Sequence, residues 1–151
     1  MTDFLSSPQI DDIINSLPEV DSKTQSKAKS RQAKLTKPQG SLGRLEDIAI
    51  WMAGWQRRDL PSIDNGQCLV FAANHGVVDQ DISIFPAEVT AQMVANFMAG
   101  GAAINQLCIL ANLKLKVIPI ELHNPTKDLS LGPAMTEEEV LDAMNIGADA
   151  L

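Results

Sequence analysis

Cys68-Leu-Val-Phe-Ala-Ala73, followed directly by Asn74-His-Gly76, is the stretch of sequence that decides the fold. This short apolar run is bounded by turn-forming residues, which predicts a strand buried on both faces, as in a parallel sheet. A second strand is predicted over residues 115–120, and two apolar helical stretches separate the two strands. A connection of that length joins parallel strands, so the sequence predicts an α/β fold.

The segment before the first strand is predicted to be helical. Apolar residues recur at helical spacing over residues 10–17 and 45–55, and the polar residues 21–35 between them are compatible with a helix. We therefore expect residues 1–60 to form an N-terminal helical segment that contributes to a small domain. Residues 61–151 are expected to begin a larger α/β domain.

The segments after the first strand carry recognisable helix boundaries. Pro86 is predicted to be the first residue of a helix, and the glycine pair 100–101 is predicted to stop or kink it before a second helical stretch. Thr136 and Glu139 form a capping box at the start of a final helix, with Gly147 as its expected C-cap.

The sequence pattern predicts two strands. A two-stranded parallel sheet leaves its faces and edges open, which makes a poor domain by itself. We therefore expect the first part of a parallel, Rossmann-like sheet that is incomplete in this chain.

The composition describes a globular, acidic protein. The 151 residues are 45% hydrophobic and 21% charged, and the net charge is −7, which disfavours general nucleic-acid binding. Residues 1–60 hold nine Lys or Arg and eight Asp or Glu, whereas residues 61–151 hold three and eleven. Six basic residues and no acid lie within residues 23–37. That run is either a solvated helix face or a contact face for an acidic partner or a phosphate.

The sequence shows no export or membrane signal. No apolar run reaches the ~18 residues that a membrane helix needs. The first eight residues carry neither a basic region nor a long apolar segment. Cys68 and Cys108 are expected to be free, reduced thiols. We therefore expect a cytoplasmic protein with no membrane partner.

His75 is the strongest single candidate for a functional residue. It follows the predicted strand at the end where open α/β sheets bind ligands, and Gly76 would let a substrate approach the backbone. The structural alternative is a loop histidine that hydrogen-bonds its neighbours. Phe85, Met93 and Phe97 are expected either to line an apolar pocket or to pack in the core.

The loop Gly40-Ser-Leu-Gly43 precedes a predicted helix and offers backbone N–H groups to an anion. Gly40, Ser41 and Gly43 are therefore a candidate anion-binding loop, although the loop matches neither a Walker motif nor a dinucleotide fingerprint. The histidines and cysteines lack metal-ligand spacing, so no metal site is expected.

Four segments in order resemble one enzyme family. They are Lys37-Pro-Gln-Gly-Ser-Leu-Gly-Arg-Leu-Glu46, Phe71-Ala-Ala-Asn-His-Gly-Val-Val78, Phe85-Pro-Ala-Glu-Val-Thr-Ala-Gln-Met93 and Gly100-Gly-Ala-Ala-Ile-Asn105. Together they resemble the N-terminal signature of the nicotinate-nucleotide–dimethylbenzimidazole phosphoribosyltransferase family. Residues 125–135 are similar to the branch of the family that has a shortened connection there.

The resemblance implies a reaction and a site. The family moves phosphoribose from nicotinate mononucleotide to 5,6-dimethylbenzimidazole, releasing nicotinate and forming α-ribazole phosphate for the lower ligand of cobalamin. The resemblance further implies small-molecule substrates, no cofactor and a homodimer. The residues that it places near the substrates are Asn74, His75, Gly76, Ser83, Phe85, Pro86, Gln92 and Met93.

The chain departs from the family pattern at two places. Asn74 stands where the family usually has Asp, and the catalytic glutamate and glycine-rich phosphate segment are expected beyond Leu151. Neither Glu88 nor Glu121 matches the motif of that glutamate. We therefore expect the N-terminal portion of a pentosyltransferase with no catalytic residue of its own, inactive alone. The alternative is an inactive binding or assembly module of the same fold.

Overall fold

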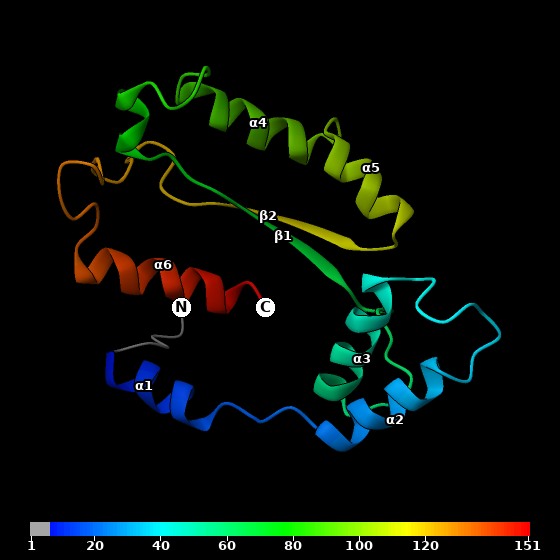
Figure 1. Ribbon diagram of the computed structural model, residues 1–151. Helices are drawn as coiled ribbons and strands as arrows, with labels where there is room; N and C mark the ends of the chain where they lie inside the picture. The colour runs from blue at the N-terminus through cyan, green and yellow to red at the C-terminus, as the bar shows by residue number, and fades with distance from the viewer. Residues whose placement is uncertain (1–6) are drawn as a thin grey trace. The chain divides into compact units, whose positions relative to one another are not determined.

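A computed structural model describes residues 7–151 and shows a mixed helix and strand fold (Figure 1). The elements in chain order are α1 (Ser7–Ser16), α2 (Ser22–Gln32), α3 (Arg44–Gln56), β1 (Gln67–Ala72), the 3-10 helix η1 (Gly76–Gln80), α4 (Glu88–Met98), α5 (Ala103–Leu110), β2 (Lys114–Pro119) and α6 (Glu137–Asp149). The α/β class is thereby confirmed.

The described chain divides into two compact units. One unit runs from Asn15 to Asp64 and contains α2 and α3. The other runs from Asn65 to Leu151, together with the part of α1 up to Ile14. The assignment of these parts to a small and a large domain of a longer enzyme stays a prediction.

The helix pair α2 and α3 forms the core of the first unit. Asp21 caps α2, because its carboxylate accepts from the Thr24 backbone N–H at 3.0 Å, and this bond lowers the pKa of Asp21. The backbone N–H of Asp21 in turn donates to the Gly54 carbonyl at 3.2 Å, which fixes the start of α2 against α3. Ala28 and Ala53 are buried, so small side chains let the two helices approach closely.

The second unit is organised by the strand pair. β1 and β2 are parallel, with Gln67 opposite Lys114 and Ala72 opposite Pro119, as the length of the connection predicted. The helices α4 and α5 pack mainly on β2 and lie on one side of the strands, and α6 lies on the other (Figure 1). The Lys116 ammonium donates to the Ala150 carbonyl at 3.1 Å, which joins β2 to the end of α6.

The expectation that the first strand is buried on both faces was wrong. Phe71 is 45% exposed, and Cys68, Leu69 and Val70 are only half-buried. The physical reason is that a run of apolar residues reports which side chains favour burial, whereas burial itself needs elements that cover both faces. In the described part of the chain, those elements cover β1 incompletely.

Two helix boundaries also differ from the predictions. Helix α4 begins at Glu88 rather than at Pro86, whose carbonyl accepts from the Val89 N–H in the preceding turn. The Thr136–Glu139 capping box is present, with hydrogen bonds of 2.7 and 3.2 Å. Gly147 is not the C-cap, because α6 continues to Asp149.

The segment Glu88–Leu110 is long and apolar enough to cross a membrane by length and composition alone, although polar residues such as Gln92 and Asn105 divide it and leave no apolar run of ~18 residues. The backbone interrupts this segment, because Gly100 adopts a positive φ of 81° between α4 and α5. Each resulting helix is shorter than the ~20 residues that span a bilayer.

Cys68 and Cys108 are both free thiols. Burial raises the pKa of the Cys108 thiol, and its hydrogen bond with Cys68 raises it further. The raised pKa favours the neutral, protonated form of the Cys108 thiol.

Candidate functional site

A cavity of about 390 Å³ lies where β1 ends. Its walls come from the residues after β1, from η1, from the loop that precedes α4 and from α4 itself. Six of the residues predicted to lie near a substrate line it, namely Asn74, His75, Ser83, Phe85, Pro86 and Met93. The structure thus brings together residues from two of the four segments that carry the resemblance, and Ser83 from the loop between them.

The residues after β1 are held by the loop that follows β2. The Asn74 side-chain amide donates to the Leu122 carbonyl at 2.8 Å. The His75 Nδ1 lies 3.2 Å from the Thr126 hydroxyl oxygen, and these two residues also form an isolated parallel bridge. His75 therefore contacts a neighbouring loop, as expected of a structural loop histidine, and it also lines the cavity.

Gly76 is the point of closest approach between these two loops. Its N–H donates to the Thr126 carbonyl at 2.8 Å. A Cβ at this position would meet that carbonyl oxygen and the Asp128 backbone nitrogen at 2.7 Å each. Gly76 does not itself line the cavity. The residue therefore supports the cavity wall through the contact between the two loops and does not touch the enclosed space.

Asp128 holds the outer end of the same loop. Its carboxylate accepts from the Ser130 hydroxyl and N–H and from the Gln80 side chain, which lies 2.6 Å away. These hydrogen bonds, those of Ser130 first, lower the pKa of Asp128. A charged carboxylate thus anchors η1 to the loop after β2.

The apolar wall of the cavity is open to solvent. Phe85 is 60% exposed and Met93 is 38% exposed. The Ser83 hydroxyl bonds both the N–H and the carbonyl of Phe85 at 3.1 Å, which orients this short loop. Side chains so exposed favour the pocket interpretation of Phe85 and Met93 over core packing.

The cavity and the sequence prediction differ at several positions. Gln92 is exposed on α4 and does not line the cavity. Sequence reasoning missed a further set of lining residues: Ala73, Val77, Val78, Ile82, Ala87, Val89 and Thr90. Thr90 stands one helical turn before Met93, so helical periodicity was the signal that could have found it.

The chemistry of the cavity follows from its lining. Aliphatic and aromatic side chains dominate, with the Asn74 amide, the His75 imidazole and two hydroxyls as the polar groups. None of these lining residues is an acid, so the cavity binds a flat apolar molecule better than it accepts a proton onto a carboxylate. Across residues 7–151, no group of three His, Cys, Asp or Glu is placed to hold a metal ion.

The loop of Gly40, Ser41 and Gly43 lies in the other unit. The Ser41 N–H donates to the Pro38 carbonyl, the Gly43 N–H to the Gly40 carbonyl, and the Leu42 N–H to the Glu46 carboxylate. An anion would have to displace these bonds and lie beside a carboxylate. Anion binding here stays a prediction, and this hydrogen bonding weakens its physical basis.

Comparison with known proteins gives a consistent family. A family model described as phosphoribosyltransferase matches residues 17–151. The nicotinate-nucleotide–dimethylbenzimidazole phosphoribosyltransferase of Mesorhizobium japonicum is 57% identical over 122 residues, which cover 81% of this chain and 36% of that protein. Its namesake from Novosphingobium aromaticivorans is 50% identical over 98% of this chain and 44% of its own length.

A solved structure agrees with these relatives. The crystal structure of the similarly named enzyme from Thermus thermophilus superposes with a TM-score of 0.77 at 38% identity. The match covers 86% of this chain and 44% of that one. The chain spans about two fifths of the length of the curated relatives that it matches.

Proposed function

Because the chain belongs to the phosphoribosyltransferase family that matches residues 17–151, we propose that it is the N-terminal part of a cobalamin-pathway enzyme. The proposed reaction transfers phosphoribose from nicotinate mononucleotide to 5,6-dimethylbenzimidazole. The relatives support these substrates, because they are named for nicotinate nucleotide and dimethylbenzimidazole. Location in the cytoplasm belongs to the same proposal.

The apolar cavity at the end of β1 is the observation that carries this proposal. Dimethylbenzimidazole is a flat, fused bicyclic base, and it needs an apolar slot with few polar groups. Phe85 and Met93 would form one wall of that slot, and His75 and Asn74 would lie at its polar end. A rigid ring beside an adaptable thioether suits a planar ligand.

The test compares the parent chain with the Met93→Ala variant. Each protein is titrated with dimethylbenzimidazole, and NMR monitors the binding. We expect acceptor binding to weaken by about 1–3 kcal/mol, the scale of losing part of a hydrophobic pocket. Binding of nicotinate mononucleotide should change little. Met98→Ala is the matched control, because Met98 lies on the same helix, is 67% exposed and does not line the cavity.

The competing interpretation makes Met93 a core residue. In that case the substitution costs about 2–5 kcal/mol of stability and leaves acceptor binding unchanged. A thermal melt of both variants beside the titration separates the two interpretations. A large fall in melting temperature with unaltered affinity for the base would refute the pocket.

We further expect no measurable phosphoribosyl transfer by the chain alone. Displacement at the anomeric carbon needs a base for the proton of the attacking nitrogen, and no cavity-lining residue is an acid. Loss of a general base typically costs 10²–10⁴-fold in rate. Formation of α-ribazole phosphate at a rate like that of a full-length relative would contradict this expectation.

A second candidate is a binding or assembly module without chemistry, acting as a homodimer. Exposed apolar side chains on α5, among them Ile109 at 74% and Leu110 at 85%, favour association. The two candidates differ in the titration, because an assembly module has no reason to select dimethylbenzimidazole over an isosteric apolar ring.

A further inference from the structure

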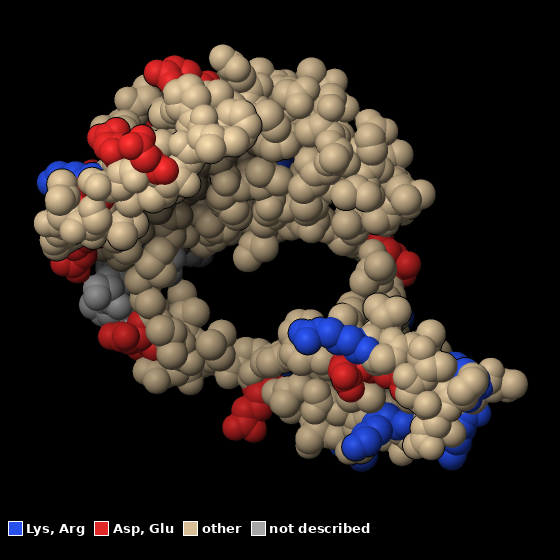
Figure 2. Space-filling view, turned by 45° about the horizontal axis from the view of Figure 1, so that its top comes forward, with Lys and Arg blue, Asp and Glu red and all other residues tan. Residues whose placement is uncertain are grey.

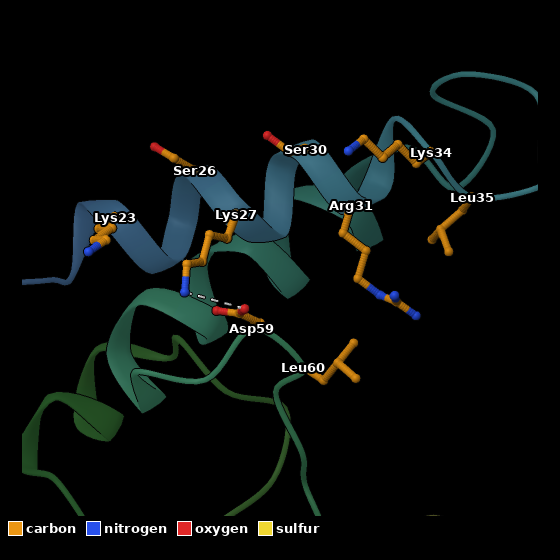
Figure 3. Close-up of a pocket in the computed structure, with 9 residues that line it drawn as sticks. All are labelled: Lys23, Ser26, Lys27, Ser30, Arg31, Lys34, Leu35, Asp59 and Leu60. Atoms are coloured by element: carbon orange, nitrogen blue, oxygen red, sulfur yellow. Dashed lines mark ion pairs between the residues drawn. The ribbon is translucent and has the colours of Figure 1, made fainter.

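The helix α2 carries a row of cations that the proposed function does not use. Lys23, Lys27 and Arg31 lie on α2 four residues apart, about one helical turn each, and Lys34 follows in the turn after the helix ends at Gln32. They line a groove of about 730 Å³, here called the α2 groove (Figure 3). Figure 2 shows blue side chains gathered on the part of the chain that holds α2 and α3.

The opposite side of the α2 groove is formed by residues after α3. Asp59 is the only acid among the lining residues, and it pairs with Lys27 at 3.6 Å. Both side chains of this pair are more than half exposed, so the pair contributes little to stability and opens readily. Leu60 lies beside Asp59 and faces Leu35, which gives one end of the groove an apolar character (Figure 3).

Arg31 is the central charge of the groove. Its side chain extends from α2 into the space between Leu35 and Leu60 (Figure 3). Within residues 7–151, no ion pair or side-chain hydrogen bond engages Arg31, Lys23 or Lys34. Three cations are therefore available to a ligand in a chain whose net charge is −7.

The length of the row decides which anion it fits. From Lys23 to Arg31 the helix rises by roughly 12 Å, and Lys34 lies in the turn beyond it, whereas one phosphate group is only a few ångströms wide. A single phosphate would use two neighbouring cations and leave the others idle. General binding of a long nucleic acid is disfavoured by the net charge of −7.

A helix with one carboxylate per turn has the complementary spacing. Its Asp or Glu side chains recur every ~5–6 Å, as do the cations of α2. Arg guanidinium groups bind carboxylates through two parallel hydrogen bonds, which suits Arg31 at the centre. Leu60 is 58% exposed and would receive an apolar side chain of the same helix.

We propose that the α2 groove is the docking site for an acidic, amphipathic helix of a partner protein. The partner presents carboxylates to Lys23, Arg31 and Lys34, and it packs an apolar side chain against Leu60, beside the Arg31 side chain. This proposal is independent of the proposed acceptor pocket, which lies in the other unit of the chain.

The probe is a fluorescein-labelled helical peptide with Glu every three or four residues and one Leu at its end. We expect it to bind the full chain in a fluorescence anisotropy titration, and we expect the same peptide with Gln in place of Glu to bind at least tenfold more weakly. The double variant Arg31→Gln, Lys34→Gln should lose at least tenfold in affinity for the Glu peptide. Added salt should weaken this binding.

The matched control is Lys29→Gln with Arg58→Gln. It removes the same number of charges from the same unit, and both residues are exposed and outside the groove. This control should lose less than twofold in affinity. Leu60→Ser should weaken binding of the Leu-ended peptide and leave an Ala-ended peptide unaffected, which tests the apolar end separately. Circular dichroism verifies that each variant is folded.

Several results would overturn the proposal. If the groove variant and the control lose affinity for the Glu peptide equally, the peptide is attracted only by the general charge of the unit and not by the groove. Equal binding of the Glu and Gln peptides would exclude carboxylate recognition. Inorganic phosphate or a short oligonucleotide that competes with the peptide at lower concentration would make the groove a phosphate site. The absence of binding to the Glu peptide would remove the docking site altogether.

Discussion

Gly76 lies where two loops approach so closely that only hydrogen fits. Its neighbours at 2.7–2.8 Å from a built Cβ are backbone atoms of Thr126, Lys127 and Asp128, which cannot rotate away as a side chain can. The wall of the candidate pocket therefore depends on a residue that never touches the ligand space. Asn74 and His75 reach their positions through the same pair of loops.

We expect Gly76→Ala to lower the free energy of unfolding by about 1–3 kcal/mol, the usual cost of overpacking. The measurement is urea unfolding followed by far-UV circular dichroism. Gly132→Ala is the control, because a Cβ there meets nothing within 4 Å. Comparable stability of the two variants would show that the loops separate at no cost.

At the scale of elements, the turn before α3 is held by one ion pair. The Lys37 ammonium lies 2.6 Å from the Glu46 carboxylate, and the same oxygen accepts from the Leu42 N–H at 3.2 Å. The two side chains are 14% and 16% exposed. The hydrogen bond from Lys37 first, and that from Leu42 second, lower the pKa of Glu46.

This arrangement predicts an acid-dependent loss of stability in the α2–α3 unit. Because the folded-state pKa is lowered, the stabilisation is present above the unfolded pKa and is lost as pH falls through the folded value. Glu46→Gln should therefore destabilise the unit at neutral pH, and its difference from the parent chain should shrink from about pH 4 downward. Fluorescence of Trp51 and Trp55, both on α3, reports the unfolding.

The control for Glu46 is Asp47→Asn. Asp47 lies in the same first turn of α3, so both substitutions remove one negative charge near the positive end of the helix dipole. We expect the smaller loss for Asp47→Asn. Equal losses would assign the effect to the helix dipole and not to the contact with Lys37.

Local patterns predicted the elements well where the cause was itself local. The Thr136–Glu139 box needs only a hydroxyl and a carboxylate three residues apart, and it forms as predicted. The parallel pairing of β1 and β2 followed from the length of their connection. Gly147 failed as a C-cap because a glycine permits a helix to end without requiring it, and α6 continues through it.

The candidate site was also predictable only where a local sequence pattern determines it. Phe85 and Met93 were found because one precedes α4 and the other lies on its apolar side. The roles of Leu122 and Thr126 in holding Asn74 and His75 were not predicted, because about fifty residues separate them in sequence. Gln92 was assigned by resemblance alone, and helical geometry turns it away from Met93 and out of the cavity.

At the scale of the molecule, much apolar surface remains in contact with water. Within the unit that begins at Asn65, Phe71 on β1, Met98 on α4 and Leu107 on α5 are each at least 45% exposed. Each square ångström of apolar surface removed from water stabilises by roughly 25 cal/mol. The entropy lost on ordering the chain is the same whether or not this surface is covered. Association of copies is the direct way for the isolated chain to cover it.

We therefore expect the isolated chain to self-associate or to be only marginally folded. Sedimentation velocity should show a sedimentation coefficient that rises with concentration. Leu110→Glu should reduce this rise, because Leu110 is 85% exposed and contributes little to the fold of one copy. Gln106→Glu adds the same charge to α5 without removing apolar surface, so it should leave association nearly unchanged. A compact monomer at every concentration, together with a sharp cooperative melt, would contradict the expectation and show that one copy stabilises itself despite its exposed apolar surface.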